Sequence, residues 1–502
     1  MLNGLFVLAA VLTLSLPSSA QSGGNIILDT TGSWRSFYKF STVVMLDGGK
    51  LQKVGVESDS PLPPSDWNSA DFDDSSWLRM SVPFDSWGRN KAEQLNLGLM
   101  GSHSDSIAIS VLCLRGKFNA DPGRAGKLNL SLVYRGGVVV YVNGKEVARG
   151  HMPKDGKINL DTPAEIYPKD VYFDEKGALY DNRSTNFEKM EARLRTMENI
   201  SIPRDVLRKG VNVLAIEVHR SPLSKEVYEK GKAVKDERQV MNFFFDSIGL
   251  VTAQLTGPGV SSNAVRPSKM QIWNSAPLVT DYDTDWGDPN EPLKPIQLVG
   301  ARNGSFSGKV VIGSTSPLKR VKGVVTDLSG KNGGSIPASA IQVRFASAPV
   351  GFDENRPARL DNLNEVPPKE VPVRNLKSSS SVRKIIGSPD AVPGAVLPVW
   401  VTVNVPAEAK ADDYEGELKI MLDGGGPFNV PVRLRVYNYL LPEPKDFTTF
   451  AELIQSPETL ALVYKVPLWS EKHWKLIEKS LYYLGLLGTK TCYIPLICKT
   501  NM

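Results

Sequence analysis

The sequence predicts a mainly β protein, with two antiparallel β-sandwich domains of jelly-roll or immunoglobulin-like type and then the first βα units of an incomplete (β/α)8 barrel. Three observations predict this order. Short β-branched runs alternate with turn residues over most of the chain, the hydrophobic period becomes helical near the C-terminal end, and a near-continuous apolar run follows that helix. A length of 502 residues allows about three domains.

Residues 1–20 predict a secretory signal peptide. An apolar run from Leu5 to Leu16 precedes a proline and small residues, a pattern that indicates cleavage after Ala20. The absence of Lys or Arg near Met1 departs from the usual pattern of such peptides. A buried N-terminal helix is the alternative, although it would be unusually apolar on every face. No later run has the length that a membrane span needs. We therefore expect a secreted or periplasmic protein.

Charge and cysteine content exclude several classes of protein. Lys and Arg number 59 against 54 Asp and Glu, and this small excess is spread along the chain, so nucleic acid is not an expected partner. Only Cys113, Cys492 and Cys498 are present, which is too few and too scattered for a disulfide scaffold. The four histidines stand far apart in the sequence and offer no zinc-type spacing.

The first sandwich is expected over residues 21–260, as a jelly roll. "KLNLSLVY" alternates leucines on one face of a strand, and "VYVNGKEV" places Asn143-Gly144 between two apolar runs, as in a tight hairpin. "GVNVLAIEVHR" predicts a strand with Val211, Val213 and Ala215 facing inward and Val218 as a further candidate. "NFEKMEARLRTM" spaces four apolar residues at helical intervals, which predicts a short amphipathic helix containing Phe187, Met190, Leu194 and Met197.

The second sandwich is expected over residues 261–440, followed by the barrel start at 441–502. In the latter, "FTTFAEL" at 447–453 and "TCYIPLI" at 491–497 predict strands. Ser470 can cap a helix that ends near Gly488. One face of that helix is expected to contain Trp474, Ile477, Leu481 and Leu484.

"WNSADFDDSSWLRMSVP", with "VYVNGKEVARG" and "GVNVLAIEVH", resembles the galactose-binding-like jelly roll at the front of many large glycoside hydrolases. Two interpretations of its residues stay open. Trp67 and Trp77 can be core anchors beside turns built by Asp73 and Asp74. Alternatively, exposed tryptophan faces stack on sugar rings, which would make carbohydrate the partner and Trp67 and Trp77 its binding residues.

The second sandwich and the tail contain the segments "GARNGSFSGKVVI", "VVTDLSG", "IPASAIQVRFA", "LPVWVTVNVPAEAKADDYEGELKI", "VPVRLRVYNYLLPEPKDF" and "VPLWSEKHWKLIEKSLYYLGLLGTKTCYIPL". Together these segments resemble the N-terminal portion of glycoside hydrolase family 123. The resemblance implies a β-sandwich and then a catalytic (β/α)8 barrel that hydrolyses terminal β-linked N-acetylgalactosamine with an adjacent Asp-Glu pair. The pairs present here, Asp174-Glu175, Asp236-Glu237 and Asp353-Glu354, all precede the expected barrel. We assign no catalytic residue and expect the barrel to be truncated.

"DYDTDWGDPNE" offers hard oxygen ligands at alternating spacing, with Asp281, Asp283 and Asp285 as candidate calcium ligands. Gly287 and Pro292 do not fit an EF-hand loop, and a polar linker between the sandwiches is the alternative. No other cofactor is expected.

Three hypotheses of function follow from these expectations. The first is the non-catalytic N-terminal part of a secreted glycoside hydrolase that acts on N-acetylhexosamine-containing glycans, with sandwiches that bind carbohydrate. The second is a secreted glycan-binding or cell-surface interaction protein without hydrolase activity. In a third reading the sandwiches serve only protein contacts.

Overall fold

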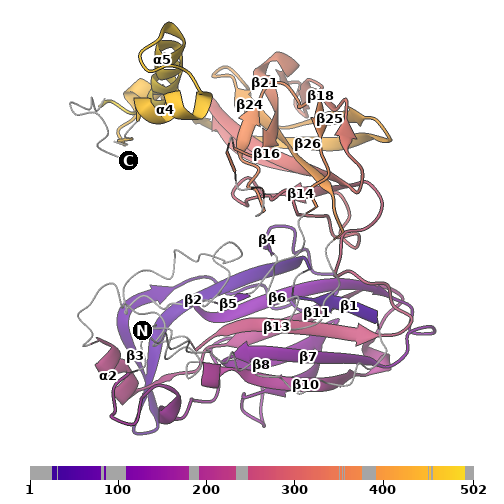
Figure 1. The fold of residues 1–502 in the computed structure, drawn as a ribbon, viewed down its shortest axis with the longest axis vertical. Coiled ribbons are helices and arrows are strands. Elements are labelled where there is room, and N and C mark those ends of the chain that lie inside the picture. The colour runs from indigo at the N-terminus through magenta and orange to yellow at the C-terminus, as the bar shows by residue number, and fades with distance from the viewer. Residues whose placement is uncertain are drawn as a thin grey trace, which may run out of the picture. The chain divides into compact units, whose positions relative to one another are not determined.

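The computed structural model describes residues 25–30, 32–80, 84–85, 109–179, 191–232, 247–349, 351–352, 354, 357–375, 392–449, 452–453 and 456–491. The predicted signal peptide, the pair Asp236-Glu237, Asp353 and nearly all of the predicted strand 491–497 lie outside these residues. The described chain is mainly β, as predicted. It divides into two compact units, the first ending at Val265 and the second beginning at Arg266 (Figure 1).

The first unit contains two sheets, and all strand pairs are antiparallel except β12 with β2. The first sheet runs in the order β1 (Asn25–Asp29), β13 (Gly249–Gly257), β7 (Leu128–Arg135) and β10 (Arg195–Ile202), with β5 (Phe84–Asp85) also paired to β13. The second runs β12 (Leu223–Ser224), β2 (Trp34–Asp47), β6 (Ile109–Ala120), β11 (Gly210–His219), β8 (Gly137–Val142) and β9 (Lys145–Gly150), with β3 (Lys50–Asp59) and β4 (Leu78–Met80) on β2. Helical elements are α2 (Lys225–Lys232) and the 3-10 turns η1 (Lys169–Val171), η3 (Glu191–Arg193) and η4 (Arg204–Val206).

The main core of this unit lies between its two sheets. Alternate residues of β7 and of β11 are buried there, including Leu130 and Leu132 from one sheet and Leu214 and Ile216 from the other. The predicted hairpin at Asn143-Gly144 is confirmed, because β8 pairs with β9 and both turn residues have positive φ, 51° and 84°.

The predicted helix through Met197 is wrong. Met197 lies in β10, whose backbone pairs with β7 from Arg195 to Ile202. Phe187 and Met190 lie outside the described residues. Met197 packs against the main core from an edge strand. Its three-residue spacing from Leu194 therefore does not reflect a helix. Pairing with β7 stabilises β10 as a strand, whereas so short a helix is only marginally stable without tertiary packing.

His151 follows β9 and gives the unit a dependence on pH. Its Nδ1 lies 2.9 Å from the Tyr134 hydroxyl, and partial burial, together with the charge of Arg195, lowers the pKa of the imidazole. Below about pH 6.5 the unfolded histidine takes up a proton that the folded one binds less readily, so stability falls as pH falls through this range.

We therefore expect the melting temperature of His151→Asn to fall less than that of the wild type between about pH 7.5 and pH 5.5. Asparagine suits the left-handed backbone at this position, φ 54°, and does not titrate. Calorimetry at both pH values measures the difference. Parallel curves for the two proteins would assign the pH dependence to other groups.

The second unit is a sandwich of two further sheets. One runs β14 (Gln271–Ser275), β16 (Gly304–Ser314), β24 (Ala395–Val405), β21 (Ile341–Ser347) and β22 (Asn362–Asn364). The other runs β15 (Ile296–Arg302), β26 (Gly425–Leu440), β25 (Asp412–Leu422), β19 (Leu328–Gly330) and β20 (Ser335–Ile336), with β18 (Lys322–Val325) on β25. A small pair joins β17 (Leu318–Lys319) to β23 (Glu370–Val371), and η7 covers Ala338–Ala340.

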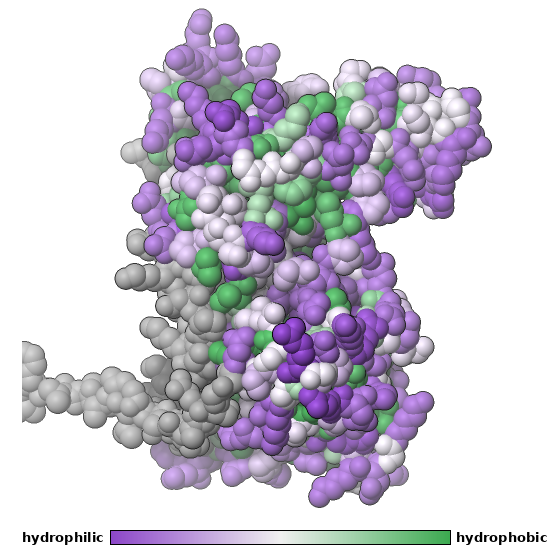
Figure 2. All heavy atoms as spheres, turned by 90° about the vertical axis from the view of Figure 1, so that its right-hand side faces the viewer, coloured by the Kyte–Doolittle hydropathy of each residue, from purple (hydrophilic) through white to green (hydrophobic). Residues whose placement is uncertain are grey.

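Valines and leucines of β16, β24, β25 and β26 fill the space between these two sheets. On β26, Val430, Val432, Leu434 and Val436 are buried while the residues between them are exposed, the alternation of a strand that covers a core with one face. Figure 2 shows one face of the molecule, where hydrophobic side chains gather over the second unit at the top of the view.

Two helices follow the sandwich, α4 (Pro457–Tyr464) and α5 (Glu471–Leu486), and Figure 1 shows them at one end of the second unit. The predicted cap is confirmed, because the Ser470 hydroxyl accepts a hydrogen bond from the His473 N–H at 3.3 Å. Gly488 follows the helix with φ 77°, as expected for its C-terminal stop. No helix in the described part of the chain is long and apolar enough to cross a membrane.

The predicted strand at 447–453 is wrong for the residues that the structure describes there. Phe447 instead ends the 3-10 turn η8 (Pro444–Asp446), where its N–H donates to the Pro444 carbonyl. Its own carbonyl accepts a bond from the Lys490 ammonium at 2.9 Å. Both backbone groups of Phe447 therefore have partners without a neighbouring strand.

The turn from β26 into η8 is bonded to the sandwich. The Leu441 N–H donates to the Arg302 carbonyl at 3.0 Å. The Asn303 side-chain amide donates to the Leu441 carbonyl at 3.1 Å and to the Glu443 carboxylate at 3.0 Å. Gly488, at the end of α5, lies against the Phe447 ring. The helices are thus attached to the sandwich through this turn.

Candidate functional site

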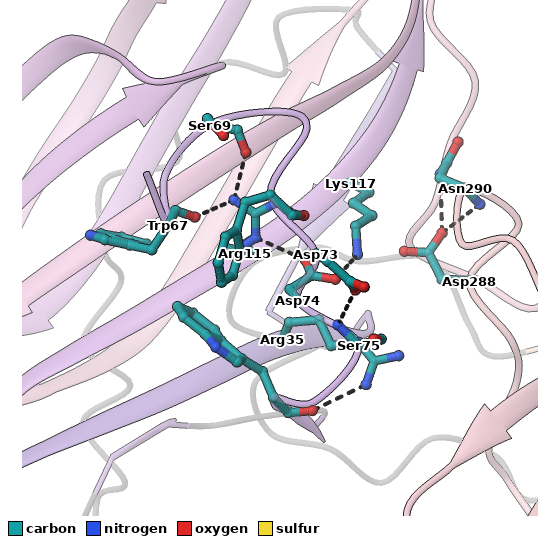
Figure 3. Close-up of polar contacts among 12 residues, drawn as sticks. Arg35, Trp67, Ser69, Asp73, Asp74, Ser75, Arg115, Lys117, Asp288 and Asn290 are labelled. Atoms are coloured by element: carbon teal, nitrogen blue, oxygen red, sulfur yellow. Dashed lines mark hydrogen bonds and ion pairs between the residues drawn. The ribbon is translucent and has the colours of Figure 1, made fainter. Parts of the chain in front are cut away.

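Arg115 is the centre of a buried polar cluster in the first unit (Figure 3). It lies on β6 with 1% of its surface exposed, and its Nε donates to the Asp74 carboxylate at 2.8 Å. The other Asp74 oxygen receives the Lys117 ammonium at 2.7 Å. Arg115 also donates to the Trp67 and Ser69 carbonyls. One guanidinium therefore holds a turn that comes more than forty residues earlier in the chain.

Trp67 and Trp77 lie at the two ends of this turn, and both are buried, at 4% and 8% exposure. Their rings stack with centroids 5.9 Å apart and pack with Val213 and Ala215 of β11. The placement agrees with the core-anchor interpretation. Protein side chains cover these rings, so their placement does not support sugar stacking.

The two aspartates of the same segment have different surroundings. Asp73 accepts the Ser75 N–H at 3.0 Å, which is the expected turn chemistry. Asp74 is bound by two cations, Arg115 and Lys117. Both carboxylate oxygens therefore have a cationic partner from β6, and Asp74 is a brace for the turn.

The candidate calcium ligands do not converge. Asp281 is buried and accepts bonds from the Lys309 ammonium and the Ser275 hydroxyl. Asp283 accepts from Arg374 at 2.7 Å and from a backbone N–H. Asp285 accepts the Tyr282 N–H at 2.8 Å. Within the described ranges, no three His, Cys, Asp or Glu side chains stand close enough to hold a metal ion.

Glu217 and His219 form a buried pair on β11 that sequence reasoning missed. His219 Nε2 lies 2.5 Å from the Glu217 carboxylate, and Nδ1 lies 2.8 Å from the Thr162 carbonyl. Both side chains are nearly inaccessible, at 5% and 1% exposure, so a substrate cannot reach this pair. The only signal in the sequence is the alternation "EVH", which places both polar residues on one face of the strand.

Asp174, in the pair Asp174-Glu175, closes a turn. Its carboxylate accepts the N–H groups of Lys176 and Ala178, at 2.9 and 2.8 Å. This hydrogen bonding is that of a local turn and not of a catalytic pair.

The helices of the second unit expose an aromatic cluster that the sequence analysis did not single out. Ile477 of α5 is buried, but Trp474, expected on the same face, is 54% exposed. Trp469, just before the helix, is 48% exposed. The ring centroids of Trp469 and Trp474 are 5.6 Å apart. In the sequence, the indication of this cluster was a pair of tryptophans on either side of the capping Ser470.

Family models match two parts of the second unit. The "Glycoside hydrolase 123 N-terminal domain" matches residues 287–422, from before β15 to the end of β25. The "Glycoside hydrolase 123, catalytic domain" matches residues 455–501, which include α4 and α5. These matches confirm the resemblance expected from the sequence. No curated protein matches the chain.

Similar solved structures include a family 123 glycoside hydrolase from Clostridium perfringens, described for glycolipid glycan hydrolysis. Its sequence is 18% identical, the alignment covers 45% of this chain and 37% of that chain, and the TM-score is 0.33. Bacteroides uniformis beta-glucuronidase 2 has 10% identity, 82% and 32% coverage, and a TM-score of 0.22. Bifidobacterium dentium beta-glucuronidase has 11% identity, 82% and 47% coverage, and a TM-score of 0.22. The chain spans less than half the length of each of these proteins.

Proposed function

We propose that this glycoside hydrolase-related protein, which resembles the members of family 123, serves the hydrolysis of N-acetylhexosamine-containing glycans outside the cytoplasm. In this proposal the described residues are the non-catalytic scaffold. The observation that carries it is the order of the two family matches, with an N-terminal-domain match at 287–422 and a catalytic-domain match at 455–501 of the same unit.

The side chains support a scaffold. Asp74, Asp281 and Asp283, the buried carboxylates weighed for a role in chemistry, are each engaged by cations of this chain. Glu217 is sealed beside His219. A glycosidase acid must reach the glycosidic oxygen, and none of these four groups is placed to do so.

One experiment tests both parts of the proposal. The whole chain is expressed in a bacterium, recovered outside the cytoplasm, and assayed on a chromogenic N-acetyl-β-galactosaminide. We expect an N-terminus at Gln21 and turnover equal to the buffer rate. Turnover well above buffer would contradict the scaffold role, and an intact Met1 on material retained in the cytoplasm would contradict export.

A further inference from the structure

We propose that Trp469 and Trp474 form an aromatic platform that binds the apolar face of a neutral sugar ring. The inference rests on the proposed function, because it supplies the glycan that such a platform would hold. The two indole planes are tilted by 43° and each tryptophan residue is about half exposed. The C–H groups on one face of a pyranose carry slight positive charge and are attracted to the negative face of an indole.

The backbone of Trp469 is the first argument that its exposure is functional. Its φ is 61°, in the left-handed region that bulky residues avoid. Burial of the ring does not offset this strain, because 48% of the residue is exposed. Strained backbone in such a residue persists where surrounding groups enforce it, and it concentrates at ligand-binding sites.

His473 is the group that enforces this conformation. It is completely buried, and its Nδ1 accepts the Trp469 N–H at 2.9 Å while its Nε2 donates to the Pro457 carbonyl at 2.7 Å. The imidazole also lies beside the Trp469 ring, with centroids 5.4 Å apart. A buried side chain with both nitrogens bonded therefore holds the Trp469 backbone and packs beside its indole before any ligand arrives, which reduces the entropy lost on binding.

The charges around the platform are of both signs. Glu471 and Glu478 stand three residues before and four residues after Trp474, so they share its exposed face of α5, while Lys472 and Lys475 stand on either side of Trp474 in the sequence. Carboxylates accept hydrogen bonds from sugar hydroxyls, and ammonium groups donate them. N-acetylgalactosamine and galactose, the hydroxyl-rich neutral sugars of the proposed function, are therefore the ligands that we propose for this surface.

Saturation-transfer NMR on the whole chain tests the platform with millimolar N-acetylgalactosamine. We expect transfer to protons on one face of the sugar, and affinities about tenfold weaker in Trp469→Ala and in Trp474→Ala. Tyr439→Ala is the matched control, since Tyr439 is 60% exposed on β26 and should leave binding unchanged.

Trp469→Gly separates ligand binding from a structural role. Glycine adopts positive φ without strain, so this variant should keep or raise the melting temperature and still lose the sugar signal. A lowered melting temperature with binding retained would show that Trp469 serves the fold alone.

Absence of transfer in the wild type overturns the platform. So does an equal loss in Tyr439→Ala, or self-association that the tryptophan variants abolish without any sugar signal. None of these results changes the turnover assay, so the platform and the scaffold role fail separately.

Discussion

Replacing Arg115 by methionine is expected to lower the free energy of unfolding of the first unit by about 3 kcal/mol or more. The guanidinium is nearly inaccessible and compensates the equally buried Asp74 carboxylate. Methionine fills a similar volume, but of the two cations that contact Asp74 it leaves only Lys117. It also removes the hydrogen bond that Arg115 donates to the Ser69 carbonyl. A buried acceptor that loses its donor keeps its full desolvation cost. Chemical denaturation followed by circular dichroism measures the change.

Lys169→Met is the control for this substitution. It also replaces a cation of an ion pair in the same unit, but Lys169 and its partner Glu226 are both largely exposed. Exposed pairs contribute little to stability, so this variant should unfold almost as the wild type does. An Arg115→Met variant as stable as the control would show that other contacts hold the turn from Trp67 to Trp77.

Gly136→Ala is expected to destabilise the same unit by more than about 4 kcal/mol, or to prevent its folding. Gly136 lies between β7 and β8 with φ 85°, and an added Cβ would stand 2.0 Å from the His219 carbonyl oxygen and 2.9 Å from that of Ser247. Both contacts are with backbone, which cannot turn away as a flexible side chain can. Relief would require the turn to move away from the end of β11.

Gly156→Ala separates this clash from backbone strain alone. Gly156 has nearly the same φ, 89°, with no atom within 4 Å of the added Cβ. The left-handed conformation then costs about 1–2 kcal/mol and nothing more is expected. Equal losses in the two alanine variants would contradict the clash. Denaturation curves of both proteins, compared with the wild type, give the answer.

Local chemistry made much of this fold predictable from sequence. The alternating leucines of β7, the Asn143-Gly144 hairpin and the Ser470 cap each depend on neighbours within a few residues. β10 was missed because its edge pairing comes from β7, about sixty residues earlier. Val213 and Ala215 were expected inside a sandwich, but they pack with Trp67 on the other face of β11. Only the fold shows that this strand is covered on both sides.

The candidate site residues also separate what is local from what depends on the fold. Their residue types were visible in the sequence, whereas the partners that they contact were not. Asp281 and Asp283 have the spacing of cation ligands, but Lys309 and Arg374, tens of residues away, provide the positive charge. Exposure is also a tertiary property. It leaves Trp67 covered and Trp469 open, although both are tryptophans beside turns.

The attachment between β26 and α4 has a mechanical consequence. Residues matched by the N-terminal-domain family model end at 422 and those matched by the catalytic-domain model begin at 455, with β26 and η8 between them. Asn303 and Arg302 bind the chain just after β26, and Lys490 and Gly488 return to Phe447. This junction is therefore hydrogen-bonded on both of its sides. A pulling force applied at the helices would have to break these bonds before the turn between β26 and α4 could extend.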